Sequence, residues 1–370
     1  MTKGTDNMKI SIEADVLAKA MKKAASILSN ATIFPICANV RLVAKGKELE
    51  VTTCDLEAEY RQTVPLAAKG EMATTVDAKK LLALASAAPD GSVLNLSLGD
   101  NRLTVTAGRG RWTMPVLPVT DFPTLPIETI GPELVIDGEV LGTALHRVEW
   151  AIYNGKAQMH LMGIFLHSEG GKVRFASANG SGLAVVTIDD EFPADAVDAM
   201  IAAKFASTLA SLAEGCEVPV SLAWDRSKIR ASMGDMVLTG KLMEASFPDY
   251  RRIIPADSDA VVIDPETVTD ALRRVMVISD EKSRCVKLAR GTDALTISAI
   301  DGIAGSSSEE IPAQCAEAFE SGINGQFFAS ILSSIGGDSI EIHQADAKAP
   351  FLIRRVVDDG AMAIVMPMKI

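Results

Sequence analysis

Residues Lys9–Leu28 read KISIEADVLAKAMKKAASIL, and the same pattern of residue types occurs twice more in the chain. The later copies are Leu134–Ile152 (LVIDGEVLGTALHRVEWAI) and Val261–Ile278 (VVIDPETVTDALRRVMVI). In each copy, alternating apolar residues lead into an acidic or Gly/Pro turn, and apolar residues at helical spacing follow. This pattern predicts a short strand that enters an amphipathic helix.

The copies are separated by the length of a domain. Two sets of equivalent residues measure the separation, which is 124 and 127 residues in the first set and 125 and 122 in the second. The sets are Ile12, Ile136 and Ile263, and Val76, Ile201 and Ile323. This period is too long for a solenoid unit and matches a whole domain. It predicts three domains, at residues 8–130, 131–258 and 259–370, after a disordered extension at 1–7.

Strand patterns recur in the same order in each third. Paired strands around a turn are predicted at Asn39–Ala44 and Glu48–Thr53, at Gly163–His167 and Lys172–Ala176, and at Val286–Ala289 and Ala294–Ala299. A second helix is predicted in each third, with Asp77 as the N-cap of the first. Hairpin-connected strands with two helices packed on one side define an α+β domain. Pro-rich segments at residues 115–132 and 247–255 are predicted to be stiff, extended connectors.

The chain has 370 residues, and 48% of them are hydrophobic, which is enough to form packed cores. Its formal charge is −12. No run approaches the roughly 18 apolar residues of a membrane span. The polar start, MTKGTDN, lacks the apolar core of a secretion signal. Five scattered cysteines show neither disulfide nor CxxC spacing, which favours free thiols. These features predict a cytoplasmic protein without a membrane partner.

Basic residues recur on the outward faces of the predicted helices, although an acidic chain as a whole argues against nucleic-acid binding. A charge run on one helix usually marks only a solvated face, but recurrence at equivalent positions favours a shared anionic ligand. Phosphate contacts carry affinity without sequence information, which suits DNA. The candidate DNA-facing residues are Lys19, Lys22, Lys23, Lys79, Lys80, His146, Arg147, Lys204, Arg273 and Arg274.

The sequence contains no catalytic constellation that we recognise. The four histidines lack metal-ligand spacing, and no phosphate-binding loop or nucleophile motif is present. The paired acids Asp189–Asp190 and Glu309–Glu310 are interpreted as surface charges. We therefore predict no catalytic residue, metal or cofactor, while an enzyme without a recognisable motif stays as a distant alternative.

The chain resembles the bacterial DNA polymerase III beta subunit family, the sliding clamps, from Met8 to Ile370. The matching segments are Phe34–Asn39 (FPICAN), Cys54–Glu59 (CDLEAE), Gly108–Pro123 (GRGRWTMPVLPVTDFP), Lys241–Pro255 (KLMEASFPDYRRIIP), Ser279–Lys282 (SDEK) and Val365–Ile370 (VMPMKI). The resemblance implies the DNA clamp fold, a homodimer that closes six domains into a ring, and helices that line a hole for double-stranded DNA. It implies a non-catalytic processivity factor. The implied partners are the polymerase III alpha subunit, the clamp loader and other proteins with a clamp-binding motif.

The resemblance also implies two protein-binding surfaces. Ring closure would bring Arg109, Trp112 and Met114 of one chain against Val277 and Ile278 of the other. Trp112 has the alternative of an ordinary core aromatic. A groove for partner peptides would be formed by Leu161, Ala178, Gly180, Ser181, Gly182, Leu183, Pro248, Arg252, Ile253, Ile364, Val365, Met366 and Met368.

The groove loop departs from the family pattern. That pattern is close to TDGHRLA, whereas Ala178–Ala184 read ANGSGLA, so a bulky residue and a positive charge become Ser181 and Gly182. The departure raises the alternative of a divergent clamp with altered partner specificity, acting as a repair or decoy scaffold.

Overall fold

The computed structural model describes residues 8–28, 33–125, 131–291, 293–301, 305–313, 320–357 and 360–370. Within these ranges the chain forms six α-helices and 22 strands, and all the strand pairs are antiparallel. This is the predicted α+β class. The predicted extension at residues 1–7 lies outside the described ranges, as does Cys315.

The helices fall into three pairs, one pair for each copy of the repeat. They are α1 (Ala14–Ala25) and α2 (Ala78–Ala87), α3 (Gly138–Glu149) and α4 (Ala203–Ala213), and α5 (Pro265–Val275) and α6 (Gly325–Ile335). Four short 3-10 turns accompany them, η1 (Pro35–Ala38), η2 (Val119–Asp121), η3 (Met159–Leu161) and η4 (Tyr250–Ile253). Each of the three opening motifs is a strand followed at once by a helix, as predicted.

The strands of the first repeat are β1 (Met8–Glu13), β2 (Asn39–Cys54), β3 (Ala58–Asp77), β4 (Val93–Gly99), β5 (Arg102–Ala107) and β6 (Gly110–Leu117). Those of the second are β7 (Glu133–Ile136), β8 (Gly163–Glu169), β9 (Lys172–Ala178), β10 (Gly182–Glu191), β11 (Ala199–Ala202), β12 (Val220–Trp224), β13 (Lys228–Met233) and β14 (Met236–Lys241). The third contains β15 (Ala260–Ile263), β16 (Cys285–Arg290), β17 (Ala294–Asp301), β18 (Gly305–Pro312), β19 (Glu320–Asn324), β20 (Ile340–His343), β21 (Phe351–Arg355) and β22 (Ala361–Val365).

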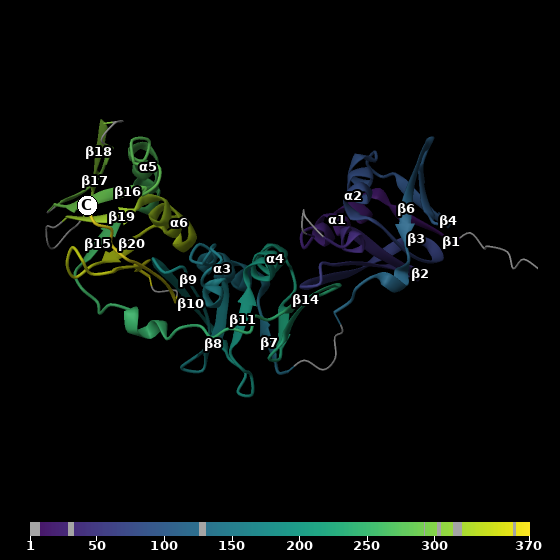
Figure 1. Ribbon diagram of the computed structural model, residues 1–370, viewed down its shortest axis with the longest axis horizontal. Coiled ribbons are helices and arrows are strands. Elements are labelled where there is room, and N and C mark those ends of the chain that lie inside the picture. Colours follow the sequence, from purple (N-terminus) through teal and green to yellow (C-terminus); the bar gives the residue numbers. More distant parts are fainter. Residues whose placement is uncertain are drawn as a thin grey trace, which may run out of the picture. The chain divides into compact units, whose positions relative to one another are not determined.

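The chain packs as two compact units whose division does not follow the repeats. Unit 1 comprises the chain up to Glu139 together with Thr208–Leu242. Its sheet has the order β1-β4-β5-β6-β3-β14-β13-β12-β7, with β2 paired to β3. The β14–β3 pairing therefore continues one sheet from the first repeat into the second. Helices α1 and α2 contact each other and pack on β2 and β3 (Figure 1).

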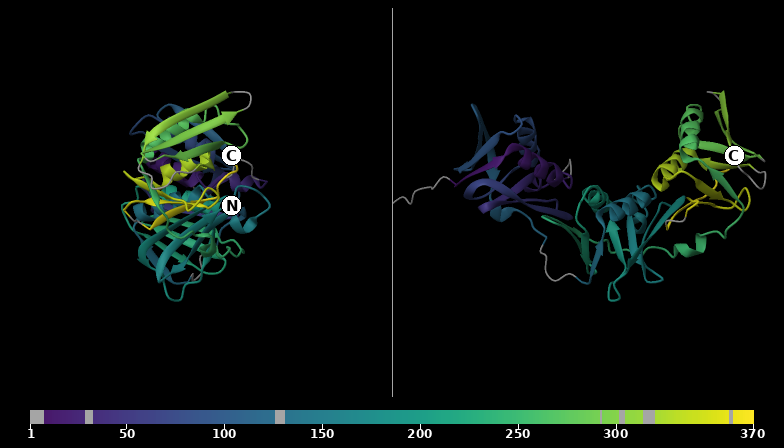
Figure 2. Two further views of the ribbon diagram at one scale, coloured as in Figure 1. Left: turned by 90° about the vertical axis from the view of Figure 1, so that its left-hand side faces the viewer. Right: turned by 180° about the vertical axis from the view of Figure 1, so that it is seen from behind.

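Unit 2 comprises Val140–Ser207 and Met243–Ile370. Its larger sheet has the order β11-β8-β9-β10-β22-β21-β20-β15, so strand β10 of the second repeat pairs with β22 of the third. A smaller sheet has the order β18-β17-β16-β19. Helices α5 and α6 contact each other beside these strands, as the rear view in Figure 2 also shows.

Apolar residues at helical spacing fix which face of each helix is buried. In α1, Leu17, Ala20, Met21 and Ala24 are buried while the lysines lie outside. Val268, Ala271, Leu272 and Val275 form the matching stripe of α5 and pack in the core of the third repeat. Burying such side chains contributes roughly 1.5–3 kcal/mol for each large aliphatic residue.

Side-chain caps decide where several helices begin. Asp77 accepts from the backbone N–H of Lys80 at 2.8 Å, which confirms its predicted role at the start of α2. Asp264 accepts from the N–H groups of Glu266 and Thr267, with Pro265 in the first turn of α5. Asn324 caps α6 through Phe327. Each cap satisfies donors that the helix leaves unpaired.

The predicted hairpins are present in all three repeats. Strands β8 and β9 pair as predicted, and so do β16 and β17. Strand β2 spans both strands of the first predicted hairpin, and Gly46 within it has φ 66°. Arg41 Nη2 donates to Glu50 Oε1 at 2.6 Å, whereas nine residues of straight strand would span about 30 Å. Strand β2 therefore folds back on itself at this turn.

The two Pro-rich connectors differ from the simple extended prediction. Phe122 and Leu125 of the first are buried against Cys54, and the backbone N–H of Leu125 donates to Glu59 Oε2 at 2.8 Å. Residues 126–130 of this connector lie outside the described ranges. The second connector contains the 3-10 turn η4. The side chain of Tyr250 is buried in this turn, so the connector is not extended there. Packing of aromatic residues, which Pro spacing does not reveal, shapes both segments.

Candidate functional site

The predicted DNA-facing residues lie on helices in all three repeats, and most of them are exposed. Lys19, Lys22 and Lys23 lie on α1 opposite its buried stripe. Lys79 and Lys80 of α2, Lys204 of α4, and Arg273 and Arg274 of α5 are exposed as well. The structure thus gives each repeat exposed basic residues on the surface of its helices.

Several of these residues have partners within the chain that the sequence did not indicate, among them Lys80 with Asp77 and Arg273 with Asp270. Half-buried Arg147 donates from Nη2 to the carbonyl of Ile335, the last residue of α6, at 3.4 Å. A cation at a helix C-terminus is favourable because the last carbonyls carry partial negative charge. Arg274 Nε donates to Glu309 Oε2 of β18 at 2.9 Å, and His146 Nδ1 lies 3.2 Å from Glu149 Oε2. Each of these contacts within the chain competes with an external ligand for the side chain.

The floor of the predicted peptide groove is a buried apolar cluster in unit 2. Leu161, Leu183 and Ile364 belong to this cluster, together with Ala178 and Tyr250. Strand β10 pairs Leu183 with Ile364 of β22, so two repeats supply one continuous floor. Pro248, Arg252, Ile253 and Met366 are exposed around it, and Val365 is buried. The structure therefore brings most of the predicted groove residues onto one sheet and its adjoining connector.

The loop between β9 and β10 is held in a defined shape. Asn179 Oδ1 accepts from the N–H groups of Ser181 and Gly182 at 3.0 and 2.8 Å. Ser181 in turn accepts through its carbonyl from the N–H of Met366 at 2.9 Å. Met368 is not tied to this loop, because it bridges to Gly322 of β19 and donates to its carbonyl at 2.8 Å. Met366 is thus fixed beside the loop, while Met368 is fixed to a different strand.

Trp150, the residue that follows α3, lies beside this loop. A Cβ atom added to Gly182 would lie 2.8 Å from Trp150 Cζ3 and 3.3 Å from the carbonyl of Ile364. The indole ring therefore occupies the space that a side chain at position 182 would need. Trp150 also packs against the core of the third repeat. The sequence analysis did not select Trp150 as a site residue. The glycine at position 182 was the one indication that a neighbouring side chain fills the space there.

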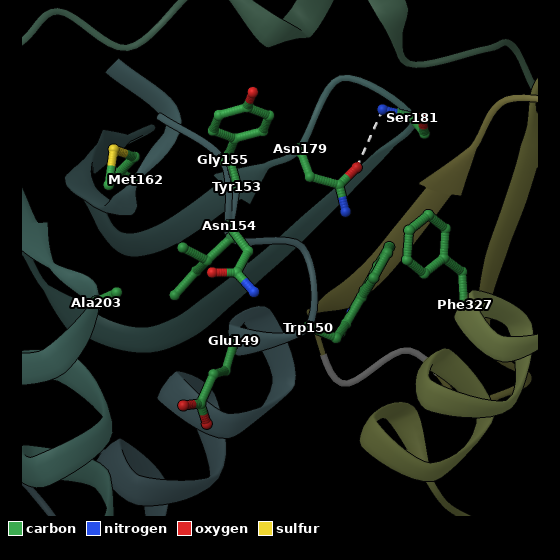
Figure 3. Close-up of a pocket in the computed structure, with 11 residues that line it drawn as sticks. Glu149, Trp150, Tyr153, Asn154, Gly155, Met162, Asn179, Ser181, Ala203 and Phe327 are labelled. Carbon is green, nitrogen blue, oxygen red and sulfur yellow. Dashed lines mark hydrogen bonds between the residues drawn. The ribbon is translucent and has the colours of Figure 1, made fainter. Parts of the chain in front are cut away.

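A hollow of about 670 Å³ adjoins the loop on the side of Trp150. Figure 3 shows the rings of Trp150 and Phe327 on one side of it and Tyr153 and Met162 on the other. The lining residues are Glu149, Trp150, Ile152, Tyr153, Asn154, Gly155, Met162, Asn179, Ser181, Ala203 and Phe327. Tyr153 also packs against the groove floor, and its N–H donates to the carbonyl of Leu161 at 3.0 Å. The hollow and the groove thus share a wall.

An aromatic cluster fixes the connector that carries Pro248, Arg252 and Ile253. The Phe165 ring stacks on His167 at 4.5 Å and on Phe247 at 5.2 Å between centroids. His167 Nδ1 lies 2.9 Å from the carbonyl of Ser168, so Nδ1 carries the proton, and Nε2 accepts from the Tyr250 hydroxyl at 2.9 Å. Arg251 of the connector donates from Nε to Glu169 at 2.8 Å. The connector is therefore attached to the sheet just before η4, through Phe247, and within η4, through Tyr250 and Arg251.

We expect the stability of unit 2 to fall as the pH drops below 6.5, in part through His167. Burial lowers the pKa of His167 from its ordinary 6.5, and the guanidinium groups of Arg174 and Arg251 add to this, opposed by the Ser168 carbonyl and Asp198. The unfolded chain then binds the proton at a higher pH than the folded chain, so stability is complete above 6.5 and declines towards the lowered folded pKa.

Thermal unfolding between pH 5 and 8 measures this effect. The His167→Gln variant should show a shallower decline than the parent chain, because its side chain does not titrate. His160→Gln, at an exposed position, should follow the parent. Parallel curves for the parent and His167→Gln would contradict the assignment.

The predicted ring-closing residues lie near two exposed sheet edges. In the described ranges, residues Gly110–Met114 of β6 pair only with β5, and β18 pairs only with β17. Trp112 is 43% exposed and Val277 77% exposed, whereas Met114 is 7% exposed. Met114 therefore already packs within its own chain, and its predicted place in the dimer contact stays a prediction.

The two edges carry opposite charge. Arg109 and Arg111 lie exposed at the start of β6, and Glu309 and Glu310 lie on β18. The sequence reading treated both acids as surface charges and did not select Arg111. What these charged residues have in common is their position at a sheet edge. The sequence does not show this position, because it depends on how the strands pair.

The described residues give no sign of a metal centre or of a disulfide. No group of three or more His, Cys, Asp and Glu side chains in those ranges could hold a metal ion. Cys37, Cys54, Cys216 and Cys285 are free thiols, and burial raises the pKa of the Cys54 thiol to about 11. No helix in the described part of the chain has the length and hydropathy required to cross a membrane.

Three repeated helix-and-sheet domains on continuous sheets, with basic residues on their helices, define a protein of the clamp fold. Residues 8–126 match the model of the N-terminal domain of the DNA polymerase III beta subunit, 135–249 that of its central domain and 251–369 that of its C-terminal domain. The chain belongs to the DNA polymerase III beta subunit family.

Relatives and solved structures match over nearly the whole length. The beta sliding clamp of Caulobacter vibrioides is 30% identical and that of Pseudomonas aeruginosa 28%, each covering 98% of this chain and 100% of the relative. A P. aeruginosa sliding clamp bound to griselimycin superimposes with a TM-score of 0.93 at 27% identity, and the C. crescentus clamp with 0.90 at 29%. Both cover 98% of this chain and 100% of the matched chain.

Family membership decides between the alternatives that the sequence left open. This family is a non-catalytic accessory subunit, so the protein is not an enzyme. The specialised repair or decoy scaffold is not favoured, because the full-length relatives are named as beta sliding clamps.

Proposed function

We propose that this protein is a DNA sliding clamp of the replication machinery. Two copies close into a ring around double-stranded DNA and hold the polymerase III alpha subunit, the clamp loader and other motif-bearing proteins on it. The observation that carries this proposal is the recurrence of exposed basic residues on the helices of all three repeats in a chain of formal charge −12. The relatives' name, beta sliding clamp, supports it. Its place of action is the cytoplasm, where bacterial DNA is replicated.

The helices provide the surface that faces DNA. Lys and Arg at matched positions would contact phosphates, which attracts DNA without reading its sequence. The remaining acidic surface repels DNA, so the duplex is favoured only along the helices. The ten candidate residues share this role. The ion pairs Lys80–Asp77, Arg273–Asp270 and Arg274–Glu309, and the contacts of His146 with Glu149 and of Arg147 with Ile335, compete with it.

Edge pairing between copies would close the ring. The free edge of β6 in one chain adds to β18 of the second copy, and Trp112 is buried against Val277 and Ile278. Arg109 and Arg111 would oppose Glu309 and Glu310, which favours this pairing over contact between two like edges. Each chain has both edges, so two identical contacts complete a closed dimer. Residues 8–130, 131–258 and 259–370 are the three domains of each chain.

The apolar floor around Leu161, Leu183 and Ile364 would receive short peptide segments of partner proteins. Exposed Ile253 and Met366 stand at its rim. Methionine adapts its shape to different apolar groups, which suits a groove that serves several partners. Pro248, Arg252 and the Asn179–Gly182 loop bound the groove, and Met368 supports it indirectly through β19.

Removing three helix cations should weaken DNA binding without any change in sequence preference. In a variant with Lys22, Lys23 and Arg273 each replaced by Gln, we expect the salt dependence of binding to a short duplex to fall by up to about three in the log–log slope. Fluorescence anisotropy over a range of salt concentrations measures it.

A matched control removes the same charge elsewhere in the first repeat. Lys45, Lys47 and Lys69 are exposed and lie on strands β2 and β3, outside the helices. Their replacement by Gln should leave the slope close to that of the parent. If the control weakened binding as much as the helix variant, general electrostatic attraction would explain the affinity.

The ring itself is tested by topology. A closed clamp should remain on closed circular DNA and leave the same DNA after linearisation, since only a free end allows a ring to slide off.

A further inference from the structure

We infer that the hollow beside Trp150 receives a lysine or arginine side chain of the partner peptide. This inference rests on the proposed peptide groove and adds a chemical requirement for the peptide. The apolar residues of the peptide would lie on the groove floor, and a neighbouring cationic residue would pass the Asn179–Ser181 loop into the hollow.

The charge of the hollow favours a cation. Among its lining residues, Glu149 is the only one with a charged side chain. Glu149 is the last residue of α3, so the partial negative charge of the helix C-terminus adds to that of its carboxylate. His146 Nδ1 lies 3.2 Å from Glu149 Oε2, and a permanently charged group of the ligand would compete for that oxygen.

The walls of the hollow favour the same group. Trp150, Tyr153 and Phe327 present aromatic rings, and the faces of such rings attract ammonium and guanidinium groups. Met162 and Ile152 provide apolar contact for the methylene stem of a long side chain. Figure 3 shows Glu149 at the edge of the hollow, with its carboxylate directed away from the rings of Trp150 and Phe327, so a long side chain would lie along the rings and reach the carboxylate with its tip. An aromatic enclosure with one carboxylate matches a side chain that is apolar along its length and cationic at its tip.

The position of the hollow links it to the groove. Tyr153 lines the hollow and packs on the groove floor, and Ser181 belongs to the loop that bounds both. The volume of about 670 Å³ exceeds that of a single side chain, so the cation can enter with water around it. Gly182 has no side chain, and Trp150 occupies the space that one would need.

The test compares peptides that differ at one position. Fluorescent peptides with the clamp-binding motif of the family are extended by one Lys, Gln or Glu, at each end in turn. At one of the two ends, we expect the Lys peptide to bind the full-length chain about fivefold tighter than the Gln peptide, with the Glu peptide weakest. Glu149→Gln should reduce this preference to less than twofold.

Glu139→Gln is the matched control, since it removes the same charge from the exposed first turn of the same helix. It should keep the full preference, which separates a local contact from the general acidity of the chain. Equal affinities for Lys and Gln peptides at both ends, or a preference that survives Glu149→Gln, would overturn the inference and leave the groove intact. If none of the peptides bound, the proposed groove would fail, and the inference would fail with it.

Discussion

The Trp112→Ala variant should separate into folded monomers at protein concentrations at which the parent chain is a dimer. Trp112 is 43% exposed on the free edge of β6, so much of its indole is available to a second copy. Truncating a central tryptophan of an interface typically costs about 2–4 kcal/mol, which weakens association by roughly 30- to 1,000-fold. Two such contacts close the ring, so the loss of association free energy occurs at both interfaces.

The ring of Trp112 is held in position before association. It lies over Gly110, where an added Cβ would approach Trp112 Cη2 to 2.3 Å. This contact keeps the indole at the edge of the sheet and reduces the entropy that binding must remove. The folding of the single chain should change little, because the lost contacts are few.

Sedimentation velocity measures the dimer over a range of concentrations. Val135→Ala serves as the control, because Val135 is a comparably exposed apolar residue, 56% accessible, on β7. It should leave the dimer intact. A Trp112→Ala chain that dimerised as tightly as the parent would place the interface elsewhere.

The Gly182→Arg variant should lose peptide binding and stability together. The Cβ of any residue at this position would lie 2.8 Å from Trp150 Cζ3, and the rigid indole packs against the core of the third repeat. Overpacking of this kind typically costs about 1–3 kcal/mol. The displaced ring or loop would also distort the shared wall of groove and hollow, so we expect peptide affinity to fall at least tenfold.

Two companion variants identify the cause. Ser181→Arg adds the same side chain to the exposed neighbouring residue and should have a small effect on the melting temperature. Trp150→Phe lacks the distal ring atoms that clash, so combining it with Gly182→Arg should recover part of the lost stability. Unfolding and peptide titration of the parent, Gly182→Arg, Trp150→Phe and the combined variant form a double-mutant cycle. A purely additive cycle would contradict direct contact between positions 150 and 182.

The sequence predicted the elements that depend on local periodicity and capping. Alternating apolar residues before Glu13, Asp137 and Asp264 indicated the strands, and Asp77 marked the start of a helix; the structure has these features where they were expected. The repeat strengthened these predictions, because the same pattern of residue types occurs in all three copies. Local signals of this type require no knowledge of distant partners.

The roles of single side chains depended on distant partners and were less predictable. Arg147 lies on α3 and Trp150 directly follows this helix, yet Arg147 binds the end of α6 and Trp150 fills the space above Gly182. Arg274 was expected to be available to DNA, but it pairs with Glu309, 35 positions further along the chain. Met114 and Trp112 lie two residues apart on the same face of β6, and only the packing of this strand shows that Met114 is buried while Trp112 stays exposed. Such contacts arise from tertiary packing, which periodicity does not encode.

Retention on DNA of defined topology tests the central claim most directly. The protein is assembled with a clamp loader and ATP on nicked circular DNA, separated from free protein by gel filtration, and followed before and after a single restriction cut. We predict that the clamp stays with the circle in moderate salt and leaves within minutes of linearisation, since its hold on DNA is topological. Equal retention on circular and linear DNA would contradict encirclement and indicate ordinary surface binding.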